Sequence, residues 1–152
     1  MKKPTLGLFV ITKNQAHDLE ACLKTCTFCD QIVVVDSGST DGTQEIAKKF
    51  TSKLFHRAFT NFLEQRQFAA EQLNTDWILY IDADERIPQA LQKKILEFIT
   101  QQESDLLEIP RRNYVLHQWI QHCGWYPDYQ PRLARRSTMK WEPQIIHEKM
   151  ST

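Results

Sequence analysis

The chain lacks a surplus of charge and a long apolar run, and each absence excludes a class of protein. Its 152 residues include 19 Lys and Arg and 19 Asp and Glu, so the formal net charge is zero. A general nucleic-acid binder is not expected, because its affinity depends on excess positive charge. No apolar run approaches the ~20 residues of a membrane span, and the run from Leu6 to Ile11 ends too soon for a secretion signal. We therefore expect a cytoplasmic protein whose cysteines are free thiols.

Three continuous apolar runs of strand length predict the centre of the fold. They are Leu6–Ile11, Ile32–Val35 and Trp77–Ile81. Runs that are apolar at every position suit strands buried on both faces of a parallel sheet. Helical periodicity fills the intervals near residues 16–26, 46–50 and 61–73 and follows the third run at 88–99. This alternation predicts an α/β domain with a mainly parallel sheet flanked by helices.

The composition of the sequence changes at about Asp105, where aromatic residues, arginine and proline become frequent and hydrophobic periodicity is poor. Short strands are expected near 106–111 and 132–136, with functional loops between them. The sequence has neither an internal repeat nor a low-complexity linker. The whole chain, residues 1–152, is therefore expected to form a single domain.

Polar clusters follow each of the three predicted strands. They are Thr12–Asn14, Asp36–Gly42 and Asp82–Glu85. Ligands of parallel α/β sheets bind beyond the carboxyl ends of the strands. We therefore expect one crevice to collect all three clusters.

The third cluster contains two carboxylates that are suited to a divalent cation. Asp82 and Asp84 follow a buried strand directly. Their side chains point the same way if the chain stays extended, and they can still converge on one ion if it turns. Mg²⁺ prefers one or two carboxylates together with phosphate oxygens and water. The alternative is a solvated acidic turn that only caps the helix beginning near Pro88.

The second cluster has the composition of a tight loop between a strand and a helix. Gly38 and Gly42 permit left-handed backbone, and Asp36 could accept hydrogen bonds from a base or a ribose. Asp41 or Thr43 could cap the following helix. A turn without a ligand is the alternative, and the Gly-Lys-Ser/Thr ending of a Walker loop is absent.

Three cysteines give a competing signal. Cys22, Cys26 and Cys29 have the Cys-x3-Cys-x2-Cys spacing of radical SAM enzymes, in which three thiolates hold an iron–sulfur cluster. However, Cys22 and Cys26 fall on the apolar face of a predicted helix, where free cysteine packs as a small hydrophobe. The five histidines form no zinc pattern.

Taken in order, the motifs resemble those of family 2 glycosyltransferases. The resemblance covers residues 6–148. It rests on Val10–Asn14, Ile32–Thr43, Gln65-Arg66, Trp77–Glu85, Pro110–Tyr114, Gly124–Gln130, Arg132-Leu133 and His147-Glu148. The later motifs are similar to the branch of β-glucosyltransferases of lipopolysaccharide core biosynthesis.

The resemblance implies a GT-A fold, which is Rossmann-like, and roles for individual residues. By that analogy Thr12, Asn14 and Asp36, with Ser37 beside them, hold the nucleoside, and Arg66 lies near the diphosphate. Asp82 contacts ribose or metal, and Asp84 ligates the metal, Mg²⁺ or Mn²⁺. Glu148 is the preferred general base and Asp128 the second candidate. Residues 1–104 form the nucleotide-sugar-binding part and 105–152 an acceptor-side part that is short at its C-terminus.

The implied reaction is inverting transfer of a hexose, with glucose expected, from a nucleotide-diphosphate sugar, with UDP as the expected nucleotide. The expected acceptor is a saccharide or lipid-linked saccharide of the lipopolysaccharide core or another cell-envelope glycan. The protein would then work in the cytoplasm, in peripheral contact with the inner membrane. Two alternatives stay open: a truncated module that binds nucleotide-sugar without transfer, and the radical SAM enzyme.

Overall fold

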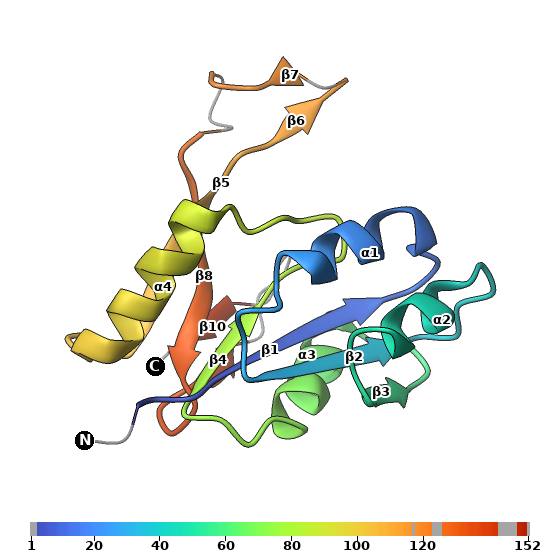
Figure 1. The fold of residues 1–152 in the computed structure, drawn as a ribbon, viewed down its shortest axis with the longest axis horizontal. Helices are drawn as coiled ribbons and strands as arrows, with labels where there is room; N and C mark the ends of the chain where they lie inside the picture. Colours follow the sequence, from blue (N-terminus) through green and yellow to red (C-terminus); the bar gives the residue numbers. More distant parts are fainter. Residues whose placement is uncertain (1–2, 117, 123–125, 143–148, 152) are drawn as a thin grey trace.

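The computed structural model describes residues 3–116, 118–122, 126–142 and 149–151. Within these residues a six-stranded sheet carries helices on both faces (Figure 1). The helices are α1 (Ala16–Lys24), α2 (Thr43–Lys48), α3 (Phe62–Glu71) and α4 (Gln89–Gln101). The strands of this sheet are β1 (Leu6–Thr12), β2 (Gln31–Asp36), β3 (Lys53–His56), β4 (Trp77–Tyr80), β5 (Leu106–Arg111) and β8 (Asp128–Arg135). Two small hairpins add β6 (Tyr114–Val115), β7 (Gln118–Trp119), β9 (Lys140–Glu142) and β10 (Lys149–Ser151).

The sheet is parallel at its centre and mixed at one side. Its strand order is β3-β2-β1-β4-β8-β5. β1 pairs in parallel with β2 and β4, and β2 pairs in parallel with β3. β8 is antiparallel to both β4 and β5. The mainly parallel α/β sheet expected from the sequence is therefore confirmed.

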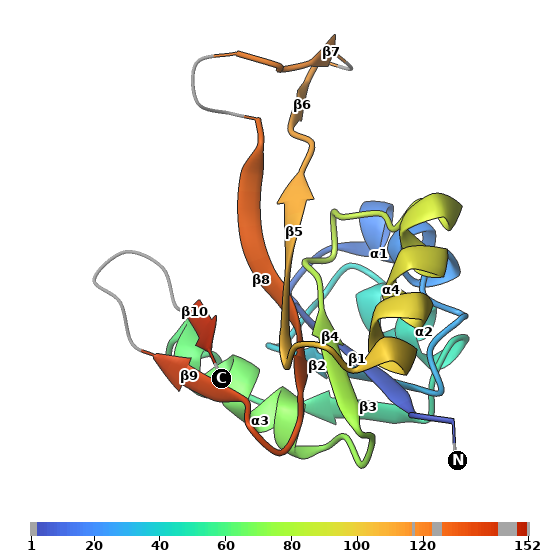
Figure 2. The ribbon, with the colours of Figure 1, turned by 90° about the vertical axis from the view of Figure 1, so that its left-hand side faces the viewer.

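The apolar strands are buried on both faces because each face packs a different set of helices. Leu6, Leu8 and Val10 of β1 belong to the core that also receives α1, α2 and α4. Phe9, between them, faces the second core, formed with α3 and Met150 of β10. Figure 2 shows this arrangement edge-on, with α3, β9 and β10 opposite the other three helices.

Glycine is required at one point where the chain passes close to β1. A Cβ on Gly7 would lie 2.4 Å from Oγ1 of Thr75 and 2.8 Å from Cδ2 of Leu73. These residues belong to the turn that joins α3 to β4. The absence of a side chain at Gly7 thus allows β4 to enter the sheet beside β1.

Candidate functional site

The turn after β4 carries the predicted acidic pair. The chain turns here instead of staying extended, because the N–H of Glu85 donates to the carbonyl of Asp82 at 3.0 Å. Asp82 is partly buried, with 37% of its side chain exposed, and Asp84 is exposed. The turn follows the carboxyl end of β4, where ligands of such sheets bind.

Arg132 of β8 holds this turn in place through hydrogen bonds. Its side chain is buried, and its Nη2 donates to Oδ2 of Asp82 at 3.1 Å and to Oε1 of Glu85 at 2.6 Å. Oε2 of Glu85 accepts the N–H of Asp82 at 2.8 Å, and the guanidinium lies 4.5 Å from the ring of Tyr80. Nη1 of Arg132 is buried without a hydrogen-bond partner among the described residues. Arg132 therefore orients Asp82 and offsets part of the negative charge.

Glu85 is the most buried acidic residue of the turn, with 23% of its side chain exposed. Burial raises the pKa of its carboxyl above the ordinary value, although the charge of Arg132 acts in the opposite direction. Its two oxygens bind Arg132 and the backbone of Asp82, so it acts as a support for the turn.

Arg66 of α3 approaches the same carboxylate. Its Nη2 lies 3.9 Å from Oδ1 of Asp82, and 13% of its side chain is exposed. The guanidinium is 5.1 Å from the ring of Tyr80 and 5.5 Å from that of Phe62. Two arginines from different elements thus converge on Asp82, and the position of Arg66 near a diphosphate, which the resemblance implied, stays a prediction.

The loop after β2 is organised around the buried carboxylate of Asp36. Its Oδ2 accepts the N–H groups of Gly38 and Ser39 at 3.1 and 3.0 Å and the amide of Gln44 at 2.9 Å. Its Oδ1 accepts the hydroxyl of Ser39. Burial acts to raise the pKa of Asp36, but these hydrogen bonds hold it below the ordinary value. The carboxylate is therefore a strong organiser of the loop, and its contact with a nucleoside stays a prediction.

Asn14 joins the end of β1 to the same loop. It adopts a left-handed backbone with φ of 53°. Its N–H donates to Oγ of Ser39 and its Oδ1 accepts the N–H of Thr40, both at 2.8 Å. The clusters after β1 and β2 are thereby held together, and a crevice that collects all three clusters stays a prediction.

Thr12 and Ser37 lie side by side where β1 and β2 end. The N–H of Ser37 donates to the carbonyl of Thr12 at 2.9 Å, and Oγ of Ser37 accepts from Nε2 of Gln65 at 2.9 Å. The hydroxyl of Thr12 is buried and has no partner among the described residues. A buried hydroxyl without a partner is costly unless a ligand or water supplies one.

Of the two residues predicted as candidates for the general base, the structure describes only Asp128. Asp128, at the start of β8, is bound by Arg111 at 2.8 and 2.6 Å and by Gln130 at 2.7 Å. Burial acts to raise its pKa, but these two partners hold it below the ordinary value, which weakens its capacity to accept a proton. Glu148, like its neighbour His147, lies outside the described residues.

The cysteines pack in the core. Cys22 and Cys26 are fully buried among residues of α1, β1 and β4, and Sγ of Cys26 donates to the carbonyl of Cys22 at 3.2 Å. The hydrogen bond with Cys26 and burial raise the pKa of Cys22, and burial raises that of Cys29. Cys22 and Cys26 therefore pack in the core as small hydrophobic residues.

The acidic pair fits a divalent cation that shares its ligands with a phosphate group. No group of three or more His, Cys, Asp or Glu within the described ranges is arranged to hold a metal. Two carboxylates with phosphate oxygens and water are nevertheless the usual Mg²⁺ environment. Asp82 and Asp84 would supply those two carboxylates at a strand end, and a ligand would have to complete the coordination; their role as metal ligands stays a prediction.

The sequence did not indicate which side chains hold this site in place. Arg132, Glu85 and Gln65 hold the predicted residues in place, but Glu85 was predicted only as part of the cluster after the third strand, and Gln65 only as part of a motif of the resemblance. Arg132 belonged to the motifs of the resemblance, but its contact with Asp82 depends on β8 entering the sheet beside β4.

Solved structures share this fold. TarS of S. aureus, residues 1–349 in complex with UDP, superposes with a TM-score of 0.65 and 21% identity over 88% of this chain and 47% of that chain. The mannosyltransferase PcManGT of Pyrobaculum calidifontis, in complex with GDP-Man and Mn²⁺, has a TM-score of 0.60 and 20% identity over 73% of this chain and 37% of that chain. The fold and the strand-end acidic turn thus define a GT-A domain.

Sequence similarity identifies the family to which this domain belongs. The family model "Glycosyl transferase family 2" matches residues 8–152, and the chain belongs to that family. The lipopolysaccharide core biosynthesis glycosyltransferase LpsC of Rhizobium meliloti is 32% identical over 96% of this chain and 57% of its own length. An uncharacterized glycosyltransferase of Rickettsia bellii is 36% identical over 66% of this chain and 34% of its own length. The chain therefore spans little more than half of LpsC and about a third of the rickettsial relative.

Proposed function

We propose that this domain binds a nucleotide-diphosphate sugar at the carboxyl edge of the sheet and transfers its hexose with inversion. The observation that carries the proposal is the turn after β4. There Asp82 is oriented by Arg132 at 3.1 Å and faces Arg66 at 3.9 Å. The donor would lie between this turn and the loop around Asp36, and its nucleoside would meet Thr12, Asn14 and Ser37.

The donor and the metal are proposed from the chemistry of the residues and from the relatives. Arg66 is placed to offset the charge of a diphosphate. Asp82 and Asp84 would hold Mg²⁺ or Mn²⁺, which supplies positive charge to the departing diphosphate. UDP is the expected nucleotide, since TarS was solved with UDP and with UDP-GlcNAc. Glucosyl-3-phosphoglycerate synthase of Mycobacterium tuberculosis, a structural neighbour, was solved with Mg²⁺ and UDP.

The acceptor is proposed from the similarity to LpsC. We infer a saccharide or lipid-linked saccharide of the lipopolysaccharide core or a related envelope glycan, with glucose as the transferred hexose. Synthesis of such a glycan from a nucleotide-sugar places the reaction in the cytoplasm. Among the described residues, no helix combines the length and apolar character needed to cross a bilayer.

The first test measures metal-dependent binding. UDP-glucose with Mg²⁺ or Mn²⁺ should raise the melting temperature of the chain, because a ligand at about a hundred times its dissociation constant adds about 2.7 kcal/mol. Asp84→Asn should remove the metal-dependent part and leave the ligand-free melting temperature nearly unchanged, since Asp84 is exposed. A thermal-shift panel of UDP, GDP, ADP and CDP sugars, each with metal and with chelator, gives both results.

Glu97→Gln is the matched control, because Glu97 is an exposed acid on α4. It should respond to donor and metal as the wild type does. Equal stabilisation by the nucleotide-sugar in chelator and in metal would overturn the proposed site. Donor binding without any transfer would instead favour the binding module that the sequence left open.

A further inference from the structure

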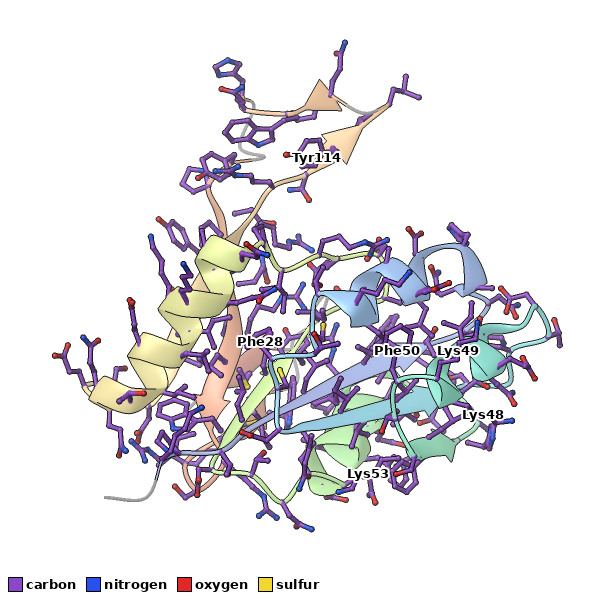
Figure 3. All side chains as sticks on the ribbon, in the orientation of Figure 1. Phe28, Lys48, Lys49, Phe50, Lys53 and Tyr114 are labelled. Carbon is purple, nitrogen blue, oxygen red and sulfur yellow. The ribbon has the colours of Figure 1, made fainter. Side chains whose placement is uncertain are left out.

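The hairpin formed by β6 and β7 is the most exposed apolar feature among the described residues. Tyr114 is 60% exposed, Val115 46% and Leu116 91%. Figures 1 and 2 both show the hairpin extending past the end of the six-stranded sheet, away from the four helices. In Figure 3, Tyr114 lies on this extension, far from the other labelled side chains. An apolar projection of this kind normally marks a binding surface.

The topology places the hairpin on the same side of the domain as Asp82. β8 runs antiparallel to β4, and β5 runs antiparallel to β8. β5 therefore runs in the direction of β4, and its end at Arg111 leaves the sheet at the carboxyl edge. β6 follows directly from that edge.

The segment that carries the hairpin has fixed charges of one sign only. Between Glu108 and Asp128 the sequence contains no Asp or Glu and contains two arginines, Arg111 and Arg112. Arg111 is bound to Asp128 at the base of the hairpin. Arg112 is exposed, and its guanidinium lies 4.7 Å from the ring of Trp119, which in turn contacts Tyr126 at 5.1 Å between ring centroids. Aromatic rings beside a cation, with aliphatic side chains at the tip, form the combination found at membrane–water interfaces.

We propose that the β6–β7 hairpin inserts its tip into the surface of an anionic phospholipid membrane. Val115 and Leu116 would enter the headgroup–acyl boundary, while Tyr114 and Trp119 lie at headgroup level. Arg112 would face the anionic headgroups. A second copy of the chain is a weaker occupant, because β6 and β7 have two residues each. Pairing through them would bury far less than the roughly 1,200–2,000 Å² of a stable interface.

The consequence for the reaction rests on the proposed function. The hairpin leaves the sheet at the edge that carries Asp82, so a membrane-bound hairpin turns that edge toward the lipid surface. An acceptor anchored in the same membrane would then meet the donor site without leaving the bilayer. The membrane contact itself does not depend on the transfer reaction.

The test is co-sedimentation of the chain with vesicles of phosphatidylcholine alone and of phosphatidylcholine mixed with phosphatidylglycerol. Wild type should bind the anionic vesicles more strongly. The double variant Val115→Ser with Leu116→Ser should lose about tenfold or more in partitioning on both vesicles, because two apolar side chains no longer enter the boundary. Arg112→Gln should lose about fivefold on the anionic vesicles and little on the zwitterionic ones.

Two control variants distinguish vesicle binding by the hairpin from nonspecific adsorption of the protein. Phe59→Ser removes an exposed apolar ring elsewhere, and Lys94→Gln removes an exposed cation on α4; neither should change vesicle binding. Each hairpin variant should keep the wild-type melting temperature and its shift with UDP-glucose and metal, so loss of vesicle binding is distinguishable from loss of the donor site. Wild-type vesicle binding in the double variant would overturn the proposal. A second result would also overturn it: wild type fails to bind vesicles, and its mass in solution rises with concentration in a way that the double variant abolishes. This result would identify a second copy of the chain as the occupant.

Discussion

Asp36 illustrates how one residue can organise a loop through its charge. Its pKa is held below the ordinary value of 3.8, in spite of burial, by hydrogen bonds from Ser39, Gly38 and Gln44. A carboxyl with a lowered pKa in the folded state binds fewer protons there than in the unfolded chain. Its contribution to stability is therefore complete above the ordinary value and is lost as the pH falls through the folded value.

We predict that Asp36→Asn lowers the free energy of unfolding at neutral pH by about 2–3 kcal/mol, because charge-assisted hydrogen bonds become neutral ones. The variant should also lose less stability than wild type as the pH falls below 3.8. Urea unfolding at neutral and acidic pH measures both effects. Glu45→Gln, an exposed acid of α2, is the control. Parallel stability curves for Asp36→Asn and wild type in the acidic range would contradict this account.

Arg132 provides the second prediction at this scale. Arg132→Met leaves the carboxylates of Asp82 and Glu85 without their shared cation, and we expect a loss of about 2–4 kcal/mol in unfolding free energy. Adding Glu85→Gln should recover part of it, because the more buried of the two carboxylates is then neutral. The coupling energy from a double-mutant cycle measures this.

Arg136→Met, which removes an exposed arginine just after β8, is the control for that cycle. Strict additivity of Arg132→Met and Glu85→Gln would show that the contact at 2.6 Å carries no energy. Donor binding by Arg132→Met should weaken together with metal binding, because Asp82 loses its orientation.

At the scale of elements, the strands and helices with strong local patterns were predictable. β1, β2 and β4 have continuous apolar runs, and α3 begins where Asn61 accepts the N–H of Glu64 at 2.8 Å. β3 was missed, because Lys53–His56 is short and carries polar residues at both ends. α1 ends at Lys24, so Cys26 lies beyond it although it is buried as expected.

The pairing of β8 could not be predicted from local patterns. A strand was expected at 132–136, but β8 begins at Asp128 and lies between β4 and β5. Nothing in its own residues indicates which strands it will join, because pairing is decided by the tertiary arrangement. The support of Asp82 by Arg132 depends on this pairing, which explains why the sequence indicated the acidic pair without the residue that orients it. The β6–β7 hairpin was likewise expected to be a loop.

The buried cysteines at and just beyond the end of α1 are the subject of a prediction about packing. Cys22→Ala combined with Cys26→Ala should cost about 2–3 kcal/mol of unfolding free energy, because two buried side chains leave unfilled space. Binding of UDP-glucose should stay measurable, since the thiols only pack in the core. Cys29→Ala, at a less buried position, should cost less. Iron and sulfide in stoichiometric amounts in anaerobically purified protein would contradict a structural role.

At the scale of the whole molecule, the carboxyl edge of one sheet gathers residues from distant parts of the chain. β1, β2 and β4 each end in a polar cluster there, and β8 brings Arg132 and Asp128 to the same side through its antiparallel pairing. The parallel core thus presents the proposed donor site, and the later strands add the proposed acceptor side. The boundary near Asp105 between these two parts stays a prediction.

The final prediction concerns the reaction of the whole chain. One carboxylate base and one stabilised leaving group suffice for a single in-line displacement, so the product should be a β-linked glycoside from an α-linked donor. Asp128 is a poor base, because Arg111 and Gln130 hold its carboxylate and its pKa is below the ordinary value. Glu148→Gln should therefore lower turnover by about 10²–10⁴ and leave donor binding intact, because the base contacts the acceptor. Asp128→Asn should have the smaller effect on turnover. Anomeric analysis of the product and kinetics of both variants decide the matter: an α-linked product excludes single displacement, and wild-type turnover in Glu148→Gln excludes Glu148 as the base.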